Sequence, residues 1–313
     1  MTVVLSRVAV VAFNSYREAV RARVLHGLFG LALGAGAYAL IVGAFSGRAR
    51  LRVVSDLGAA SISAFAIVVA VVLGATSLYR ELELKTIFPI LARPIHRTEY
   101  LVGKYLGILL TLVVFVAANT GALLLALGEL AGQSALVCIG VGAGSLALFA
   151  VLWWRLPRQR TALPIAWAAL LSLAGYLLAA GAPDDRRLLA SSALLTLCEV
   201  GIVTAIATLF AAFSTPFLTA VLTFGLFVVG RSADTLGNLP VRLFGEGVRA
   251  TGQVVSRFVP NLMLYVPERP LLTGEAAGVT LPSYLLESAG HALAWVVGLL
   301  AVASLLFRRR DFV

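Results

Sequence analysis

The sequence predicts an all-α, polytopic membrane protein with about eight membrane-spanning helices and an N-terminal amphipathic helix. Of its 313 residues, 60% are hydrophobic and only 13% are charged, and the mean hydropathy is +0.96. Soluble domains average about half apolar and a quarter charged residues. About 20 apolar residues span the hydrocarbon core as a helix, because lipid offers backbone groups no hydrogen-bond partner. Such stretches cover residues 24–46, 57–79, 105–127, 134–154, 162–181, 188–212, 217–230 and 285–307.

Residues 1–23 form the first predicted unit, an amphipathic helix that lies in the membrane interface and leads into the first span. One face carries Arg7, Asn14, Glu18 and Arg21, whereas the opposite face is mainly apolar. Residues 24–313 are predicted to form one transmembrane domain.

The distribution of basic residues predicts the orientation. With eight spans the termini share a side, and placing both in the cytoplasm puts most of the 25 Lys and Arg residues there. Arg48, Arg50 and Arg52, in one outer loop, argue the other way. The net charge of +10 then reflects contact with lipid headgroups, so membrane lipid is an expected partner and nucleic acid is not.

Residues 80–104 form a compact polar segment between the second and third spans. Pro89 and Pro94 leave room for only about one turn of helix between them. The segment contains one histidine and neither a cysteine cluster nor a serine paired with a base, so we expect no catalysis there. A short rigid segment suits docking into a cleft on another protein, because rigidity lowers the entropic cost of binding.

The sequence lacks the motifs of a nucleotide or metal site. No GxxxxGK(S/T) loop is present, since Lys104 is followed by Tyr105, so we expect the chain not to be an enzyme by itself. Cys138 and Cys198 fall inside apolar spans, and the neighbouring Glu287 and His291 supply only two metal ligands. We therefore expect no catalytic residue, metal or cofactor in this chain.

Two polar features outside this segment are open to more than one interpretation. Residues 241–259, within the outer loop 231–283, predict an interfacial helix that either covers the outer mouth of the bundle or is an ordinary surface helix. Glu199 lies in the middle of a span, where burying a carboxylate is costly. It is either part of a translocation pathway, with Asn119, or a packing residue hydrogen-bonded to Asn119 or Thr120.

The polar segment also carries a family resemblance. Its residues resemble the pattern E-x(4)-T…L-x-x-P-x-x-R…G-K-x-x-G, found between the second and third helices of type-2 ABC exporter permeases. The resemblance is closest to the multicopper-enzyme-maturation-like permease branch. The stretches YREAVRARVLHG (16–27), FSTPFLTA (213–220) and PNLMLY (260–265) resemble the elbow helix, an inner turn and an external-loop motif of the same family. The matching residues of the pattern are Glu81, Thr86, Pro94, Arg97, Gly103, Lys104 and Gly107.

The resemblance implies the transmembrane permease subunit of an ABC exporter in a bacterial-type cytoplasmic (inner) membrane. It implies a homodimer with a second copy of itself and two copies of a cytoplasmic ABC ATPase subunit, which supplies the ATP and Mg sites. Residues 80–104 would form the coupling loop. The residues expected to carry ATPase coupling are Glu81, Thr86, Arg93, Pro94, Arg97 and Lys104.

The chain departs from this family in two respects. The family usually has six spans, so residues 134–181 are interpreted as an inserted helical hairpin. The two methionines and two separated cysteines provide few soft ligands, which argues against copper as the cargo. Two alternatives remain open: an ion-gradient-driven secondary transporter, disfavoured by the lack of an internal repeat, and a non-transporting anchor that recruits an ATPase.

Overall fold

The computed structural model describes residues 2–83, 96–275 and 278–309. Over these ranges the chain forms helices and connecting turns without a β-strand, which confirms the predicted all-α fold. The long helices are α1 (Thr2–Val20), α2 (Arg23–Ala44), α3 (Arg50–Glu83), α5 (Arg97–Leu130), α6 (Ala135–Arg155), α7 (Leu163–Leu178), α8 (Pro183–Ala211), α9 (Pro216–Arg231), α11 (Val241–Phe258) and α13 (Leu281–Arg309). Short helices are η1 (Gly47–Ala49), η2 (Ala179–Gly181), α10 (Ala233–Gly237), η3 (Leu262–Tyr265) and α12 (Arg269–Thr273).

Seven helices in the described part of the chain are long and apolar enough to cross a membrane, namely α2, α3, α5, α6, α7 with η2, α8 and α13. Each corresponds to one of the predicted spans. The remaining predicted span, residues 217–230, is α9, which has only 16 residues. At 1.5 Å per residue it is about 24 Å long, less than the hydrocarbon core of about 30 Å.

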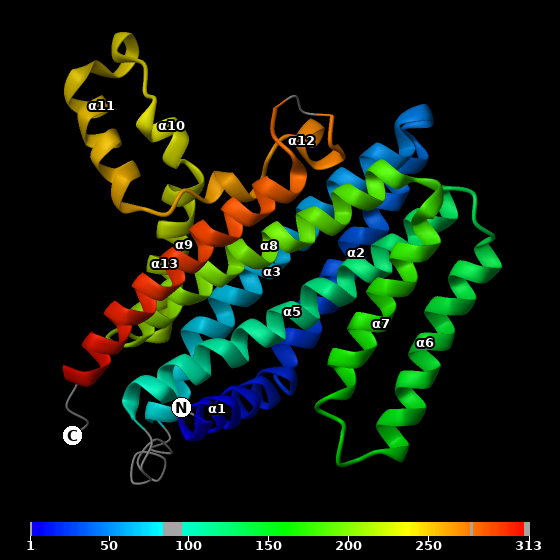
Figure 1. Ribbon diagram of the computed structural model, residues 1–313, viewed down its shortest axis with the longest axis horizontal. Coiled ribbons are helices and arrows are strands. Elements are labelled where there is room, and N and C mark those ends of the chain that lie inside the picture. The colour runs from blue at the N-terminus through cyan, green and yellow to red at the C-terminus, as the bar shows by residue number, and fades with distance from the viewer. Residues whose placement is uncertain (1, 84–95, 276–277, 310–313) are drawn as a thin grey trace.

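Helices α5 and α8 form the centre of the bundle. Several of their large apolar side chains are fully buried, among them Leu112 and Leu127 of α5 and Leu195, Ile202 and Ile206 of α8. Helix α5 packs mainly against α7 and α1, and α8 packs mainly against α3 and α13. The hairpin of α6 and α7 stands at one side of the bundle, with α6 outermost and almost wholly exposed (Figure 1).

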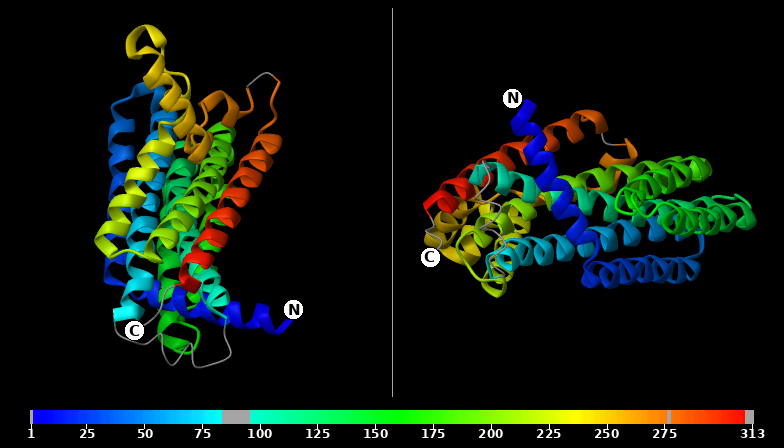
Figure 2. Two further views of the ribbon diagram at one scale, coloured as in Figure 1. Left: turned by 90° about the vertical axis from the view of Figure 1, so that its left-hand side faces the viewer. Right: turned by 90° about the horizontal axis from the view of Figure 1, so that it is seen from below.

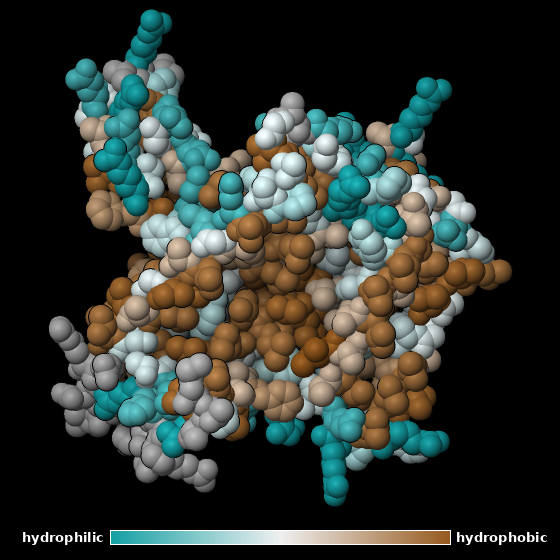
Figure 3. Space-filling model, viewed as in Figure 1, coloured by the Kyte–Doolittle hydropathy of each residue, from teal (hydrophilic) through white to brown (hydrophobic). Residues whose placement is uncertain are grey.

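The amphipathic helix α1 lies across one end of the bundle (Figure 2). The start of α1 and the end of α13 are at this same end, as predicted for termini that share a side (Figure 1). Hydrophobic side chains form a broad band around the middle of the molecule, with hydrophilic side chains gathered at both ends (Figure 3). This arrangement is that of a multi-pass membrane protein.

The helix predicted over residues 241–259 is present as α11 (Val241–Phe258). It packs against α10, and the pair stands apart beyond the end of α9 (Figure 1). Gly245, with φ of 79° and ψ of 166°, interrupts the helix near its start.

Candidate functional site

A cavity of about 480 Å³ opens between α3, α8, α9 and the η3–α12 connection. Its wall is mostly apolar, with Ala60, Ala64 and Ile67 from α3 and Phe224 and Phe227 from α9. Polar groups line it from several elements: Asp56, Ser63, Ser192, Thr196, Arg231, Tyr265 and Arg269. A mainly apolar cavity with a few converging polar groups is typical of a ligand site.

An ion pair between α8 and α9 lies at this cavity. Arg231 Nε is 2.7 Å from Glu199 Oε1, and Arg231 Nη2 is 2.9 Å from Glu199 Oε2. Ser63 Oγ donates to Glu199 Oε2 at 3.4 Å. The Glu199 side chain is fully buried, whereas that of Arg231 is 25% exposed and lines the cavity. The guanidinium also lies 5.6 Å from the centre of the Phe227 ring, so it contacts Phe227 of its own helix as well as Glu199 of α8.

The partner of Glu199 therefore differs from the one expected. Asn119 and Thr120 were the predicted partners, but Arg231 and Ser63 bind the carboxylate instead. Asn119 donates from Nδ2 to the Phe115 carbonyl at 2.9 Å and lines a separate cavity of about 160 Å³ between α2, α3 and α5. Helix α3 lines both cavities, and the side chain of Asn119 is hydrogen-bonded within α5 whereas that of Glu199 is bonded to Arg231 and Ser63. One signal in the sequence pointed to Arg231: it is the basic residue that directly follows the short apolar span.

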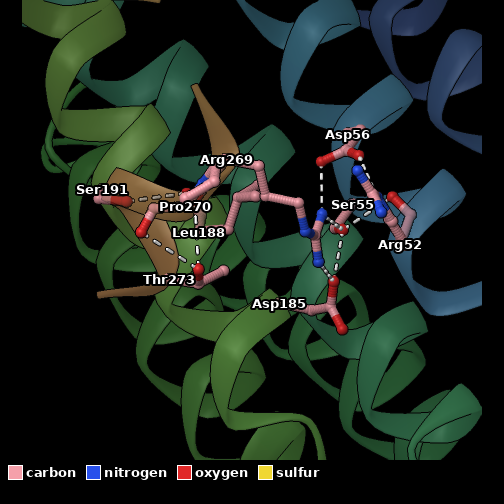
Figure 4. A network of polar contacts seen from close by, with 9 residues as sticks. All are labelled: Arg52, Ser55, Asp56, Asp185, Leu188, Ser191, Arg269, Pro270 and Thr273. Atoms are coloured by element: carbon pink, nitrogen blue, oxygen red, sulfur yellow. Dashed lines mark hydrogen bonds and ion pairs between the residues drawn. The ribbon is translucent and has the colours of Figure 1, made fainter. Parts of the chain in front are cut away.

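A second polar cluster lies at the end of the bundle opposite α1, centred on Arg269 of α12 (Figure 4). The guanidinium bridges Asp56 of α3 and Asp185 of α8, and it donates to Ser55 Oγ at 3.3 Å. Ser55 Oγ donates in turn to Asp185 Oδ1 at 2.7 Å. Partial burial lowers the pKa of Arg269, but the hydrogen bonds and charges of the two aspartates outweigh it and raise that pKa. The η3–α12 connection is thereby tied to α3 and α8.

At the opposite end of the bundle, Lys104 joins three elements. Its Nζ is 3.4 Å from Glu18 Oε2 of α1, 3.4 Å from the Ser77 carbonyl of α3 and 3.3 Å from Ser77 Oγ. Lys104 is only 3% exposed. It belongs to the predicted coupling segment, and the structure places it inside the protein, between the helices that flank that segment.

Two glycines allow α1 to approach α5 closely beside Lys104. A Cβ added at Gly103 would lie 2.7 Å from Val11 Cβ, and one added at Gly107 would lie 2.4 Å from the Ala12 carbonyl oxygen. Either contact is closer than real Cβ atoms allow. Packing therefore explains the G-K-x-x-G part of the sequence pattern. Gly103 and Gly107 leave room for α1, and Lys104 between them binds Glu18 of α1.

The start of α5 is fixed by further contacts. His96 and Glu99 form a reciprocal capping box, and Arg7 of α1 lies 3.9 Å from Glu99. Arg97 donates from Nη1 to the Phe307 carbonyl of α13 at 3.5 Å. The rings of Tyr100 and Phe307 stack with 6.4 Å between their centres. Helices α1, α5 and α13 are thus joined where α5 begins.

Not all of the predicted coupling residues can be placed. Glu81 belongs to the last turn of α3, and Thr86, Arg93 and Pro94 lie outside the described residues. Helix α3 ends at Glu83 and α5 begins at Arg97, and both of these helix ends lie at the end of the bundle that carries α1 (Figure 1).

The histidine considered as a metal ligand is engaged in hydrogen bonds. Trp295 Nε1 donates to His291 Nε2 at 3.0 Å, so neutral His291 carries its proton on Nδ1, which is 2.8 Å from the Tyr265 hydroxyl. No group of three or more His, Cys, Asp or Glu residues suited to a metal ion occurs in the described ranges. Cys138 and Cys198 are both free thiols.

Comparison with known proteins gives one match. A protein-family model described as ABC-2 family transporter protein matches residues 4–233, a range that runs from the first turn of α1 to the end of α9 and includes Glu199 and Arg231 but not Arg269. A search of curated proteins finds no match to the chain.

Proposed function

The chain belongs to the ABC-2 family of transporter proteins and is a membrane component of an ABC transporter; from this premise we propose that it is the permease subunit of an exporter. Two copies face each other in a bacterial-type inner membrane with their termini in the cytoplasm. Two copies of a separate ATPase dock on residues 80–104 and supply the sites for ATP and Mg.

The contacts of Lys104 are the observation that carries the coupling proposal. Ser77 lies in α3 three residues before the coupling segment begins, and Lys104, in α5 at the end of that segment, binds Ser77 and Glu18 of α1 together. A force applied to the segment is therefore transmitted to α1, α3 and α5 as one unit, and through Arg97 to α13. In this proposal Glu81, Thr86, Arg93 and Pro94 contact the ATPase, while Lys104 carries the movement into the bundle.

The cavity between α3, α8 and α9 is the proposed half of the translocation pathway. Its polar groups lie at the Glu199–Arg231 pair and the Arg269 cluster, and its wall is otherwise apolar. Phe224 of α9 lines it and is exposed, Phe217 is exposed on the same helix, and both would face the second copy. A mainly apolar pathway with charged positions suits an amphipathic cargo.

The test is to purify the tagged chain with its ATPase in nanodiscs and to measure vanadate-sensitive ATP hydrolysis for Arg93→Glu. The matched control is Arg48→Glu, an equal charge change at the opposite end of the bundle. The proposal expects Arg93→Glu to abolish ATPase association and hydrolysis, and Arg48→Glu to retain both. Hydrolysis that survives Arg93→Glu would refute the docking role, and a stable chain that never associates with an ATPase would refute the subunit assignment.

A further inference from the structure

The hairpin of α6 and α7 creates a second cavity, of about 520 Å³, against α2 and α5. It lies beside the first turns of α2 and α7 and the last turns of α6, near the end of the bundle that carries α1. Apolar and aromatic side chains form nearly all of its lining, including Phe29, Phe115, Phe149, Trp153 and Trp167. We call this cavity the hairpin groove.

The hairpin groove has almost no polar group to offer a soluble ligand. Thr111 and His26 line it, but the Thr111 hydroxyl already donates to the Gly107 carbonyl at 3.0 Å, and His26 Nδ1 lies 3.1 Å from the Ala22 carbonyl oxygen. The indole N–H of Trp167 points to Ser145 Oγ at 3.4 Å. A groove of this size and apolar character, within a membrane-spanning bundle, matches a hydrocarbon chain.

The rim of the groove is strongly basic. The two chain segments that frame it, residues 19–27 and 151–164, contain Arg21, Arg23, Arg155, Arg158 and Arg160 and no Asp or Glu. All five arginines are exposed. Arg160 donates from Nε to the Trp153 carbonyl at 2.9 Å, and its guanidinium carbon lies 5.8 Å from the Trp153 ring centre. One arginine is thus held directly above a wall of the groove.

We propose that the hairpin groove binds an acyl chain of a phospholipid whose anionic headgroup is held by the arginines at its rim. The apolar lining accounts for the chain, the guanidinium groups account for the phosphate, and Trp153 lies where the two meet. A second copy of this protein fits less well, because it would bring the same five arginines against these and add repulsion.

The test uses tryptophan fluorescence in nanodiscs that contain a small fraction of brominated lipid in a zwitterionic background. A Trp154→Phe and Trp295→Phe background leaves Trp153 and Trp167, which both line the groove, as the fluorophores. We expect brominated anionic phospholipid to quench them at a lower fraction than brominated zwitterionic lipid does. Arg160→Gln should weaken this preference about fivefold, the factor that corresponds to ~1 kcal/mol for one basic residue, whereas Arg48→Gln should not change it.

Two alanines on α6 allow binding in the groove to be distinguished from binding to the surrounding lipid-facing surface. Ala150 is exposed and lines the groove, whereas Ala147 is exposed and does not. Ala150→Phe should abolish selective quenching, and Ala147→Phe should leave it intact. Native mass spectrometry of the otherwise unchanged chain should show an anionic lipid that Ala150→Phe removes, which covers the case in which the double tryptophan variant does not fold.

Three results would overturn the proposal. Equal quenching by both lipids would show a groove filled only by bulk lipid. Equal effects of Ala150→Phe and Ala147→Phe would place the lipid elsewhere. An absence of quenching by either lipid, in a folded protein, would mean that protein covers the groove.

Discussion

The ammonium group of Lys104 lies 3.4 Å from the carboxylate of Glu18, and this ion pair joins the amphipathic helix α1 to the first turns of α5. The lysine is almost fully buried, whereas the glutamate side chain is 36% exposed. A buried ammonium requires hydrogen-bond acceptors, and Ser77 of α3 supplies two more. The contact therefore links three helices at the end of the bundle to which the ATPase is proposed to bind.

Lys104→Met should destabilise the protein by about 1–3 kcal/mol, because it leaves the Ser77 carbonyl and Glu18 without a charged donor. Glu18→Gln should cost less, since Glu18 retains access to water. The free energy of unfolding in detergent mixtures measures both changes, and the variant that carries both substitutions completes a double-mutant cycle. If the two effects simply add, the pair does not interact as described. Either variant should also lower transport per ATP hydrolysed, while ATPase association persists.

Gly107→Ala should displace α1, because its methyl group would lie 2.4 Å from the Ala12 carbonyl oxygen. Overpacking of this kind costs about 1–3 kcal/mol. Thermal stability and protease cleavage of α1 are the measurements. Gly144→Ala is the matched control, since nothing lies within 4 Å of its added Cβ and alanine favours a helix. Equal stability of the two variants would contradict the close packing of α1 on α5.

Glu199→Leu should destabilise the bundle by about 3–5 kcal/mol, because Arg231 would remain as an uncompensated charge beside α8. Replacing both partners, as Glu199→Leu with Arg231→Met, should recover much of this loss, since an apolar pair of similar size needs no desolvation. The free energy of unfolding of the single and double variants tests the pair. A double variant less stable than Glu199→Leu alone would show that Arg231 is stabilised by other groups.

Arg269→Gln should loosen the η3–α12 connection from α3 and α8, because the bridge between Asp56 and Asp185 is lost. The two aspartates would then repel each other, so we expect a destabilisation of about 1–3 kcal/mol that salt reduces. Arg249→Gln on the exposed face of α11 is the control and should have little effect. Hydrogen exchange of residues 260–275 should rise only in the first variant.

A cysteine at Ala60 should report on the translocation pathway. In a background with Cys138 and Cys198 replaced by serine, Ala60→Cys lies in the cavity wall and is exposed. Its reaction with a charged thiol reagent should change when ATP and vanadate trap the transporter. Ala169→Cys, exposed on α7 outside this cavity, should react at an unchanged rate. An ATP-independent rate at Ala60 would argue that the cavity lies outside the pathway.

The spans could be predicted from sequence because each is a long uninterrupted apolar run. The predicted span 134–154 corresponds to α6 at Ala135–Arg155, and 285–307 lies within α13 at Leu281–Arg309. The helices extend beyond the apolar runs at their polar ends, where charges pair with other helices instead of ending the helix. Helix α3 is an example, since it begins at Arg50 and places Asp56 within reach of Arg269.

The side-chain pairs of the candidate site could not be predicted in the same way. Glu199 was recognised as costly in a membrane, but its partner is 32 residues away on another helix, and hydropathy contains no information on which helices touch. Likewise, Gly103 and Lys104 matched a family pattern, whereas their role in seating α1 became visible only from the packing of α1 on α5. The family match over residues 4–233 supports the resemblance and assigns no residue a role.

The shortness of α9 has a consequence for the membrane itself. A helix about 24 Å long cannot match a hydrocarbon core of about 30 Å, so the bilayer beside α9 must thin or the helix end must draw headgroups and water inward. Arg231 stands at that end, and α9 forms one wall of the proposed pathway. Either adjustment takes place next to the cavity that α9 lines. The acyl-chain length of the host membrane therefore determines the size of the mismatch at α9, and thick bilayers impose the larger one.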